Sequence, residues 1–312
     1  MSNIKNEITN AIGINFNNIS KDSAFNIIKS EKENGYTRQL INYISFGDTV
    51  TAYLLIPDVV DKNPAVLINH QHNSERHLGK SEVCGLAGNP LQAFGPVLAQ
   101  KGFVVLSPDS VCFEERRKNA QGIAPLSGDG DFLQHYNEMC YRIIKGENLA
   151  QKVLSDAMNG ITLLSKLEFV DNNRIGTLGH SYGGNTVLFL SAVDERIKFS
   201  CASKSACTYK NKMQNNVGIE MASVIPNFIQ KYDIYDLVRC IAPRQLLIVS
   251  AEDDKYSRDA DYIVEQAKSS YAEYHALNNL CHMKYSGGHP LTKEQFDFII
   301  EWVIEKGDFY TK

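Results

Sequence analysis

Five short runs of apolar residues follow one another along the chain and constrain its fold more than any other feature. The runs are continuous rather than alternating, which is typical of strands buried on both faces of a parallel sheet. They lie at residues 65–68, 103–106, 174–178, 197–202 and 245–249. Segments with a helical pattern separate them, at 90–101, 147–168 and 183–192. This alternation predicts an α/β fold in which helices cover both faces of a mostly parallel sheet.

Residues outside these runs suggest an arm, a hairpin and insertions. Residues 1–35 are rich in Asn, Lys and Ile and weakly amphipathic, so we expect an N-terminal helical arm. Residues 37–46 and 49–57 predict two strands of a hairpin. We expect a single domain over 36–312 with a helical insertion at about 205–240, because that stretch is too long for a simple crossover.

The composition excludes several classes of protein. Hydrophobic residues make up 43% of the 312 residues, which excludes a disordered chain and suffices for a large core. The 32 basic and 36 acidic residues leave a net charge of −4, so no positive field attracts nucleic acid or an anionic membrane. We therefore expect a small-molecule substrate and neither a nucleic-acid nor a membrane partner; the oligomeric state stays unknown.

The cysteines and the start of the chain bear on its location. The chain opens on polar residues, so we expect no signal peptide. An odd number of scattered cysteines without a CxxC pair indicates free thiols in a reduced, cytoplasmic compartment. The seven are Cys84, Cys112, Cys140, Cys201, Cys207, Cys240 and Cys281.

The strongest local motif is the sequence GHSYGG at 179–184, which follows one predicted strand and precedes a predicted helix. A nucleophile on a tight strand-to-helix turn needs glycines on both sides, because the strand and the helix come close together. The turn also places the serine oxygen at the positive end of a helix, where developing negative charge is stabilised. We therefore predict that Ser181 is a nucleophile rather than part of a plain glycine-rich turn.

A nucleophilic serine needs a base that an acid orients, and both should follow it in chain order, each in a loop past a strand. Asp254 is our candidate for the acid because it lies four residues past a predicted strand end; Asp253 stays open as the alternative. His289 is our candidate for the base, since two glycines precede it and let it reach the serine. His275 and His282 compete with it but lie in or before the last predicted strand.

The loop after the strand at 65–68 offers a second site element. An oxyanion hole needs two backbone N–H groups, one following the nucleophile and one from this loop. We expect them to be those of Tyr182 and His72.

The same loop resembles a metal cluster, through His70, His72, Glu75 and His77. The two-zinc hydrolase pattern HxHxDH requires Asp at 74 and His at 75, where this chain has Ser and Glu. We therefore expect no metal, and histidines that shape the mouth of the loop.

A charged stretch, Glu114-Glu115-Arg116-Arg117, lies just past the strand at 103–106. Such a run is usually a solvated surface. Because it lies past the carboxyl end of a strand, one carboxylate could instead support the active-site loop through an internal ion pair. The sequence leaves both interpretations open.

Together these residues resemble the α/β-hydrolase superfamily, through the GHSYG motif, Asp254 and His289. More narrowly, the chain between about residues 50 and 305 resembles the dienelactone hydrolase and acetyl xylan esterase branch. The stretches that carry this narrower resemblance are 70–73, 78–80, 102–109, 233–237 and 241–244.

The resemblance implies a sheet of about eight mostly parallel strands, no cofactor and no metal, and hydrolysis of a carboxylic ester. Some dienelactone hydrolases use a cysteine nucleophile, whereas position 181 is serine, which favours ordinary ester chemistry. We expect a short-chain or acetyl esterase. A thioesterase, peptidase or acyltransferase with the same triad, or a ligand-binding protein without catalysis, stays open.

Specificity should lie in residues 110–146 and 205–240. The aromatic residues there either line an acyl or sugar pocket or form the core of the insertions, and we favour the core. They are Phe113, Phe132, Tyr136, Tyr209, Phe228 and Tyr232.

Overall fold

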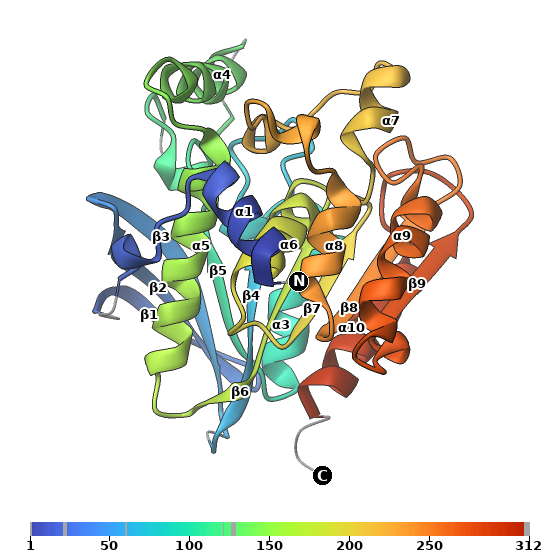
Figure 1. The fold of residues 1–312 in the computed structure, drawn as a ribbon. Coiled ribbons are helices and arrows are strands. Elements are labelled where there is room, and N and C mark those ends of the chain that lie inside the picture. Colours follow the sequence, from blue (N-terminus) through green and yellow to red (C-terminus); the bar gives the residue numbers. More distant parts are fainter. Residues whose placement is uncertain (1, 21–23, 60, 121, 126–128, 309–312) are drawn as a thin grey trace.

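One sheet of nine strands runs through the computed structural model, which describes residues 2–20, 24–59, 61–120, 122–125 and 129–308 (Figure 1). The strand order is β1-β2-β3-β5-β4-β6-β7-β8-β9. The strands are β1 (Phe25–Glu33), β2 (Tyr36–Ser45), β3 (Asp48–Pro57), β4 (Asn63–Asn69), β5 (Val104–Pro108), β6 (Val170–His180), β7 (Phe199–Ser203), β8 (Gln245–Ala251) and β9 (Leu280–Tyr285). Pairing is antiparallel from β1 through β3 to β5 and parallel from β5 onward. The predicted α/β class is confirmed.

The five apolar runs form the centre of this sheet as β4 to β8. Along β4, Val66 and Ile68 belong to one core cluster, whereas Leu67 belongs to the cluster on the opposite face. All three side chains are fully buried. The runs are continuous in the sequence because helices cover both faces of the sheet. The predicted hairpin is also confirmed, since β2 pairs with β3 from Tyr36 to Ser45.

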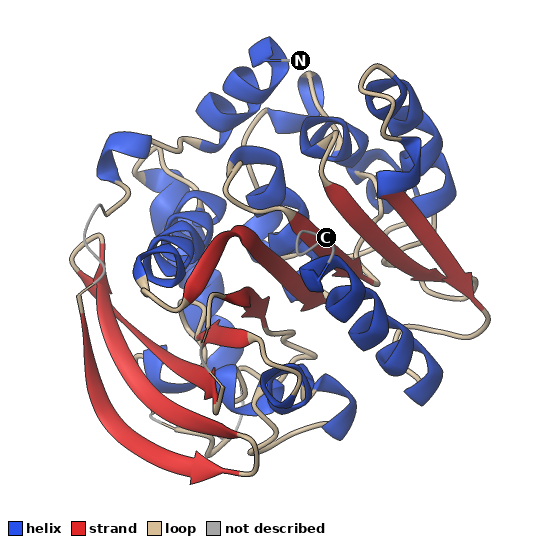
Figure 2. Cartoon of the chain, turned by 90° about the horizontal axis from the view of Figure 1, so that it is seen from below, coloured by secondary structure: helices blue, strands red, loops and turns tan. Residues whose placement is uncertain are grey.

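Helices cover the two faces unequally (Figures 1 and 2). Side chains of α3 (Phe94–Gln100) and α10 (Lys293–Asp308) pack on one face. Those of α5 (Leu149–Lys166), α6 (Tyr182–Val193), α8 (Ile234–Ile241) and α9 (Ala260–Ala272) pack on the other. The remaining helices are α1 (Ser2–Ile12), α2 (Lys80–Val83), α4 (Gly130–Ile144) and α7 (Tyr209–Gln214), with short 3-10 turns between elements.

The N-terminal arm is helical only in its first part. Helix α1 places Ile8 and Ile12 in the core, where both are fully buried. Residues 25–33, which we expected to be helical, form the edge strand β1 and pair with β2. Most side chains of β1 are exposed, so the strand has no continuous apolar face that the sequence could reveal. Its backbone hydrogen bonds to β2 decide the conformation, and weak helical periodicity does not.

The structure also bears on the cysteines, on membrane-spanning helices and on the two inserted stretches. All seven cysteines are free thiols and five of them are buried. Of the helices in the described part of the chain, none has both the length and the apolar character needed to cross a membrane. The stretch at 205–240 contains α7 and most of α8, and the stretch at 110–146 contains α4.

Candidate active site

Ser181 occupies the turn between β6 and α6, which end and begin at the residues on either side of it. Its φ of 54° and ψ of −116° lie in a region that L-residues rarely adopt. Such a conformation costs about 1–3 kcal/mol and persists where the surrounding structure enforces it. The turn therefore holds the serine side chain in a fixed position at the carboxyl edge of the sheet.

Two glycines of the motif are required by close packing at this turn. A Cβ on Gly183 would lie 1.9 Å from the carbonyl oxygen of Asn69, at the end of β4. A Cβ on Gly179 would lie 2.3 Å from the carbonyl carbon of Gly183. The glycines let α6 start directly against the end of β4, and this contact brings the serine beside the loop that follows β4.

The structure brings Ser181, His289 and Asp254 together. The Oγ of Ser181 lies 2.8 Å from Nε2 of His289, and Nδ1 of His289 lies 3.0 Å from Oδ1 of Asp254. An ionised carboxylate accepts the Nδ1–H proton, which leaves Nε2 free to accept the serine hydroxyl proton. Sequence order and geometry therefore agree on one linear chain of hydrogen bonds.

Asp254 is buried beneath His289 with 1% of its surface exposed. Burial alone would raise the pKa of this carboxyl, but hydrogen bonds from His289 and from Ser257 outweigh it and lower the pKa below its ordinary value. The Ser257 hydroxyl donates to Oδ2 over 2.6 Å. Asp254 thus stays ionised, as a group that orients an imidazole must.

Asp253, the alternative acid, has a different position. It is exposed, and its backbone N–H donates to the carbonyl of Gly287. This bond ties the strand-end loop to the loop that carries His289. The structure therefore brings Asp254, and not Asp253, to the histidine.

The competing histidines lie away from the serine. His275 is exposed on a turn, and His282 bonds through Nε2 to the hydroxyl of Ser250 over 2.8 Å. A histidine of the motif itself, His180, lies with its ring 5.2 Å from that of His289. Burial lowers the pKa of His180 well below its ordinary value, so its neutral ring adds no charge beside His289.

A cavity of about 270 Å³ opens over Ser181. Its wall includes His289, Tyr182 and His72, so both residues that we expect to form the oxyanion hole border the space above Ser181. Helix α6 begins at Tyr182. The N–H groups of its first turn have no partner within the helix and point toward the turn that holds Ser181.

Comparisons with known proteins find similarity to hydrolases. The family model of the prolyl oligopeptidase family matches residues 126–257, which include Ser181 and Asp254. A candidate hydrolase of Bacillus subtilis (strain 168), YtaP, is 23% identical over 88% of this chain and 90% of its own.

Solved structures of esterases share the fold over most of this chain. A candidate acetyl xylan esterase of Bacteroides fragilis NCTC 9343 superposes with a TM-score of 0.75 at 16% identity, covering 91% of this chain and 74% of its own. Acetyl xylan esterase 1 of Thermoanaerobacterium sp. JW/SL YS485 gives 0.59 at 15% identity, covering 98% and 93%. The chain has the α/β-hydrolase fold.

The histidine cluster of this α/β-hydrolase fold does not form the metal-ligand set that its sequence resembles. His70 is buried, its Nε2 accepts the N–H of Ser110, and its Nδ1 lies 2.7 Å from the carbonyl of Gln71. Nε2 of His72 pairs with Glu220 over 2.5 Å. Among the described residues, these histidines belong to no group of three or more ligands that could hold a metal.

The charged stretch after β5 supports the loops of the α/β-hydrolase site from inside. Glu114 is 1% exposed and accepts backbone N–H bonds from Gly79 and Ser81. The ammonium of Lys80 lies 2.5 Å from Glu114 and 2.9 Å from Asp109, and it also contacts Glu115. The internal ion pair is confirmed, and a solvated surface is wrong for Glu114, because its carboxylate satisfies buried donors.

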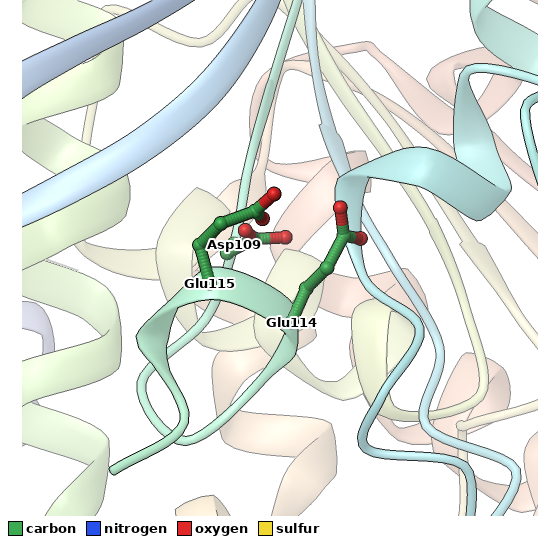
Figure 3. Close-up of side chains that lie close together, drawn as sticks. All are labelled: Asp109, Glu114 and Glu115. Carbon is green, nitrogen blue, oxygen red and sulfur yellow. The ribbon is translucent and has the colours of Figure 1, made fainter. Parts of the chain in front are cut away.

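Asp109, Glu114 and Glu115 point toward one another in Figure 3 and resemble a metal site. The Lys80 ammonium, which is fully buried, contacts all three carboxyl groups, while burial and the neighbouring Glu114 raise the pKa of Asp109 to about 7. We define these four residues as the Lys80 cluster; it fits an internal ion pair.

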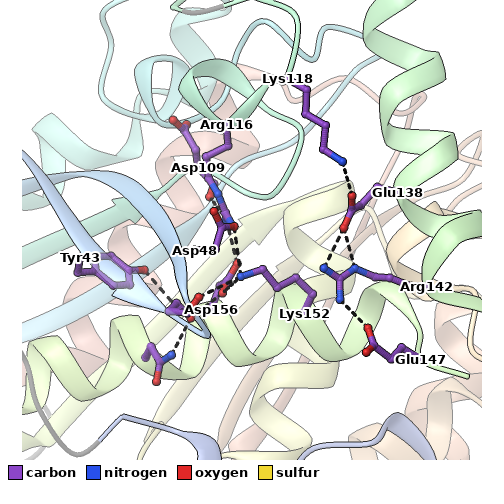
Figure 4. Close-up of polar contacts among 12 residues, drawn as sticks. Tyr43, Asp48, Asp109, Arg116, Lys118, Glu138, Arg142, Glu147, Lys152 and Asp156 are labelled. Atoms are coloured by element: carbon purple, nitrogen blue, oxygen red, sulfur yellow. Dashed lines mark hydrogen bonds and ion pairs between the residues drawn. The ribbon is translucent and has the colours of Figure 1, made fainter. Parts of the chain in front are cut away.

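A larger cavity of about 790 Å³ lies elsewhere and is lined by charged side chains that pair with one another (Figure 4). Arg116 bonds to Asp48 and Asp156, and Lys152 also bonds to Asp156. Ser181, Asp254 and His289 are not part of its wall. Its charges balance locally, which indicates a structural network.

Sequence reasoning missed most of the wall of the smaller cavity above Ser181. Of the six aromatic residues considered, only Phe132 lines it. Tyr209, Phe228 and Tyr232 are buried in the core, as favoured, but Tyr136 is exposed, so the core interpretation is wrong for Tyr136. The charged residues of this wall come from segments far apart in the sequence, and no motif marks them. They are Arg76, Lys204, Lys212 and Glu220.

Proposed function

We propose that this protein is a serine hydrolase that cleaves a carboxylic ester through an acyl-enzyme. The observation that carries the proposal is the pair of hydrogen bonds that links Ser181 through His289 to Asp254. Such a chain activates a serine hydroxyl that is otherwise a weak nucleophile.

Acylation begins when the Ser181 Oγ attacks the acyl carbonyl carbon. His289 Nε2 takes the hydroxyl proton, and Asp254 stabilises the imidazolium that forms. The carbonyl oxygen becomes an oxyanion that accepts hydrogen bonds from the backbone N–H groups of Tyr182 and His72. His289 then returns the proton to the leaving alcohol as the C–O bond breaks.

Deacylation repeats these steps with water. His289 takes a proton from water, the hydroxide attacks the acyl-enzyme, and the proton passes back to Ser181 as the carboxylic acid leaves. Every group in this cycle belongs to the chain or to the substrate, so the proposal needs no metal and no cofactor.

A short acyl group, such as acetyl, fits this site best. The cavity of about 270 Å³ is smaller than the roughly 300–1,000 Å³ typical of pockets for drug-sized ligands. Two similar solved structures carry the name acetyl xylan esterase, which supports the same substrate class. A cytoplasmic location stays a prediction.

A peptidase is the second candidate, because the matching family model is named for prolyl oligopeptidases. A thioesterase or an acyltransferase would use the same triad. A ligand-binding protein without catalysis is disfavoured, since binding alone needs no activated serine.

Kinetics on a panel of substrates tests the proposal. The purified protein should hydrolyse 4-nitrophenyl acetate faster than longer acyl esters and faster than an aminoacyl-proline 4-nitroanilide. The Ser181→Ala variant should lose activity by several orders of magnitude. A variant that retains the parent rate on short esters would refute the proposal, and a preference for the anilide would favour the peptidase.

A further inference from the structure

Lys212 is a buried lysine in the wall of the cavity above Ser181. It lies in α7 and has 3% of its surface exposed. Its ammonium forms no hydrogen bond and no ion pair with any residue that the structure describes. Burying an ammonium without a partner costs free energy, so packing alone does not account for the position of Lys212.

The acidic groups near Lys212 are already engaged elsewhere. Glu220 pairs with His72, and the carboxylate of Asp233 accepts three backbone N–H bonds at the starts of α7 and α8. Asp259 binds the N–H and the hydroxyl of Thr208. These carboxylates act on Lys212 only at longer range.

The other buried lysines among the described residues all have partners. Lys80 lies in the Lys80 cluster, and Lys152 bonds to Asp156. Lys204 donates to the carbonyl of Gly288 over 2.5 Å. Of the buried lysines that the structure describes, Lys212 alone lacks a hydrogen-bond or ion-pair partner. It also borders the cavity above Ser181. Burial lowers its pKa below the ordinary value, as expected where no contact offsets desolvation.

Arg76 is a second buried cation in the same wall, with 4% of its surface exposed. Its Nε donates to Nδ1 of His135 over 2.9 Å, and its guanidinium lies over the rings of Phe113 and Phe132. It forms no ion pair with any described carboxylate. The other N–H groups of its guanidinium therefore have no hydrogen-bond acceptor among the described residues. The cavity wall thus holds two cations that no described carboxylate contacts directly, although Glu220 acts on both at longer range.

We propose that Lys212 and Arg76 bind a carboxylate of the substrate, so that the preferred ester carries a free carboxylate group besides the ester bond. The inference rests on the proposed ester hydrolysis and adds the substrate class. A carboxylate is small enough to share the cavity with an acyl group, and it offers oxygen acceptors to both side chains. Lys212 is then a specificity residue that acts in binding.

Matched esters test this inference. Monomethyl adipate carries one free carboxylate, and dimethyl adipate has the same chain with that charge masked. 4-Acetoxybenzoate and its methyl ester form a second pair, with the charge in the leaving alcohol. In at least one pair the wild-type protein should prefer the acidic ester in kcat/KM by roughly 10- to 100-fold, the range for hydrogen bonds between charged groups.

The Lys212→Met variant should lose this preference, mainly through a higher KM for the acidic ester. Lys212→Arg should restore part of it. The matched control is Lys210→Met, which removes an exposed lysine from the same helix and should change neither ester. Lys212→Met should also melt no lower than wild type, because it removes a buried charge without a partner; a lysine kept for structure would lower the melting temperature.

Binding provides a readout without turnover. Calorimetry with adipate on the Ser181→Ala protein should detect binding that is lost when Lys212→Met is added. Adipate binding that survives Lys212→Met, or equal kcat/KM within both ester pairs, would overturn the inference. If Ser181-dependent hydrolysis of the neutral esters persists in that case, the proposed function stands alone; if no ester is hydrolysed, the proposed function fails and the calorimetry still decides the binding site.

Discussion

The Lys80 cluster and the cavity above Ser181 both bury positive charge, but they compensate it differently. The Lys80 ammonium contacts three carboxylates, and two of them, those of Asp109 and Glu114, also accept backbone N–H bonds from its own loop. Lys212 has no such contact among the described residues. The comparison indicates that the first region fixes loops, whereas the second is arranged for a ligand.

The largest effect should come from the acid of the triad. Asp254→Asn should lower kcat by about 10⁴, because the imidazole loses the group that fixes its tautomer. Steady-state kinetics on 4-nitrophenyl acetate would measure the loss. The matched control is Asp253→Asn, which should stay within a few-fold of wild type; equal losses in the two variants would contradict the assignment.

Stability measurements test the contrast between the two buried lysines, Lys80 and Lys212, directly. Lys80→Met should destabilise the protein by about 3–5 kcal/mol, because it leaves buried carboxylates without their cation. Lys212→Met should not lower the free energy of unfolding. Urea unfolding of both variants would test the contrast, and similar losses for both would mean that Lys212 is structural as well.

A smaller, pH-dependent effect should come from Glu220, the carboxylate in the cavity wall. Burial would raise its pKa, but His72 and more distant cations lower it to about 2. A lowered pKa contributes stability that is complete above the ordinary value of 4.5 and is lost as the pH falls toward about 2.

Wild type should therefore lose its stability advantage over Glu220→Gln within that pH range. Melting temperatures of both proteins between pH 7 and pH 2 would measure this. A difference that does not change with pH would show that the Glu220 carboxylate titrates normally.

The sequence was sufficient for those parts of the fold that packing on both faces determines. Strands β4 to β8 appear as continuous apolar runs because helices bury both sides. Strand β1 could not be predicted, since it lies at an edge with mostly exposed side chains and is held by its pairing with β2. Local patterns carry no information on such pairing.

The candidate site also contains residues that the sequence could predict and residues that it could not. Ser181, Asp254 and His289 could be predicted because each follows a strand, and the ends of parallel strands meet at one edge of the sheet. Arg76 and Lys212 could not be predicted, because only the three-dimensional path of the loop after β4 and of α7 brings them into one wall. The role of Glu114 stayed open for the same reason.

Covalent labelling with a fluorophosphonate, followed by mass spectrometry of the labelled peptide, tests most directly whether Ser181 is an activated nucleophile. We expect a single labelled position at Ser181 in the wild-type protein and loss of labelling in His289→Ala. An unlabelled Ser181 in a folded protein that still hydrolyses esters would contradict it.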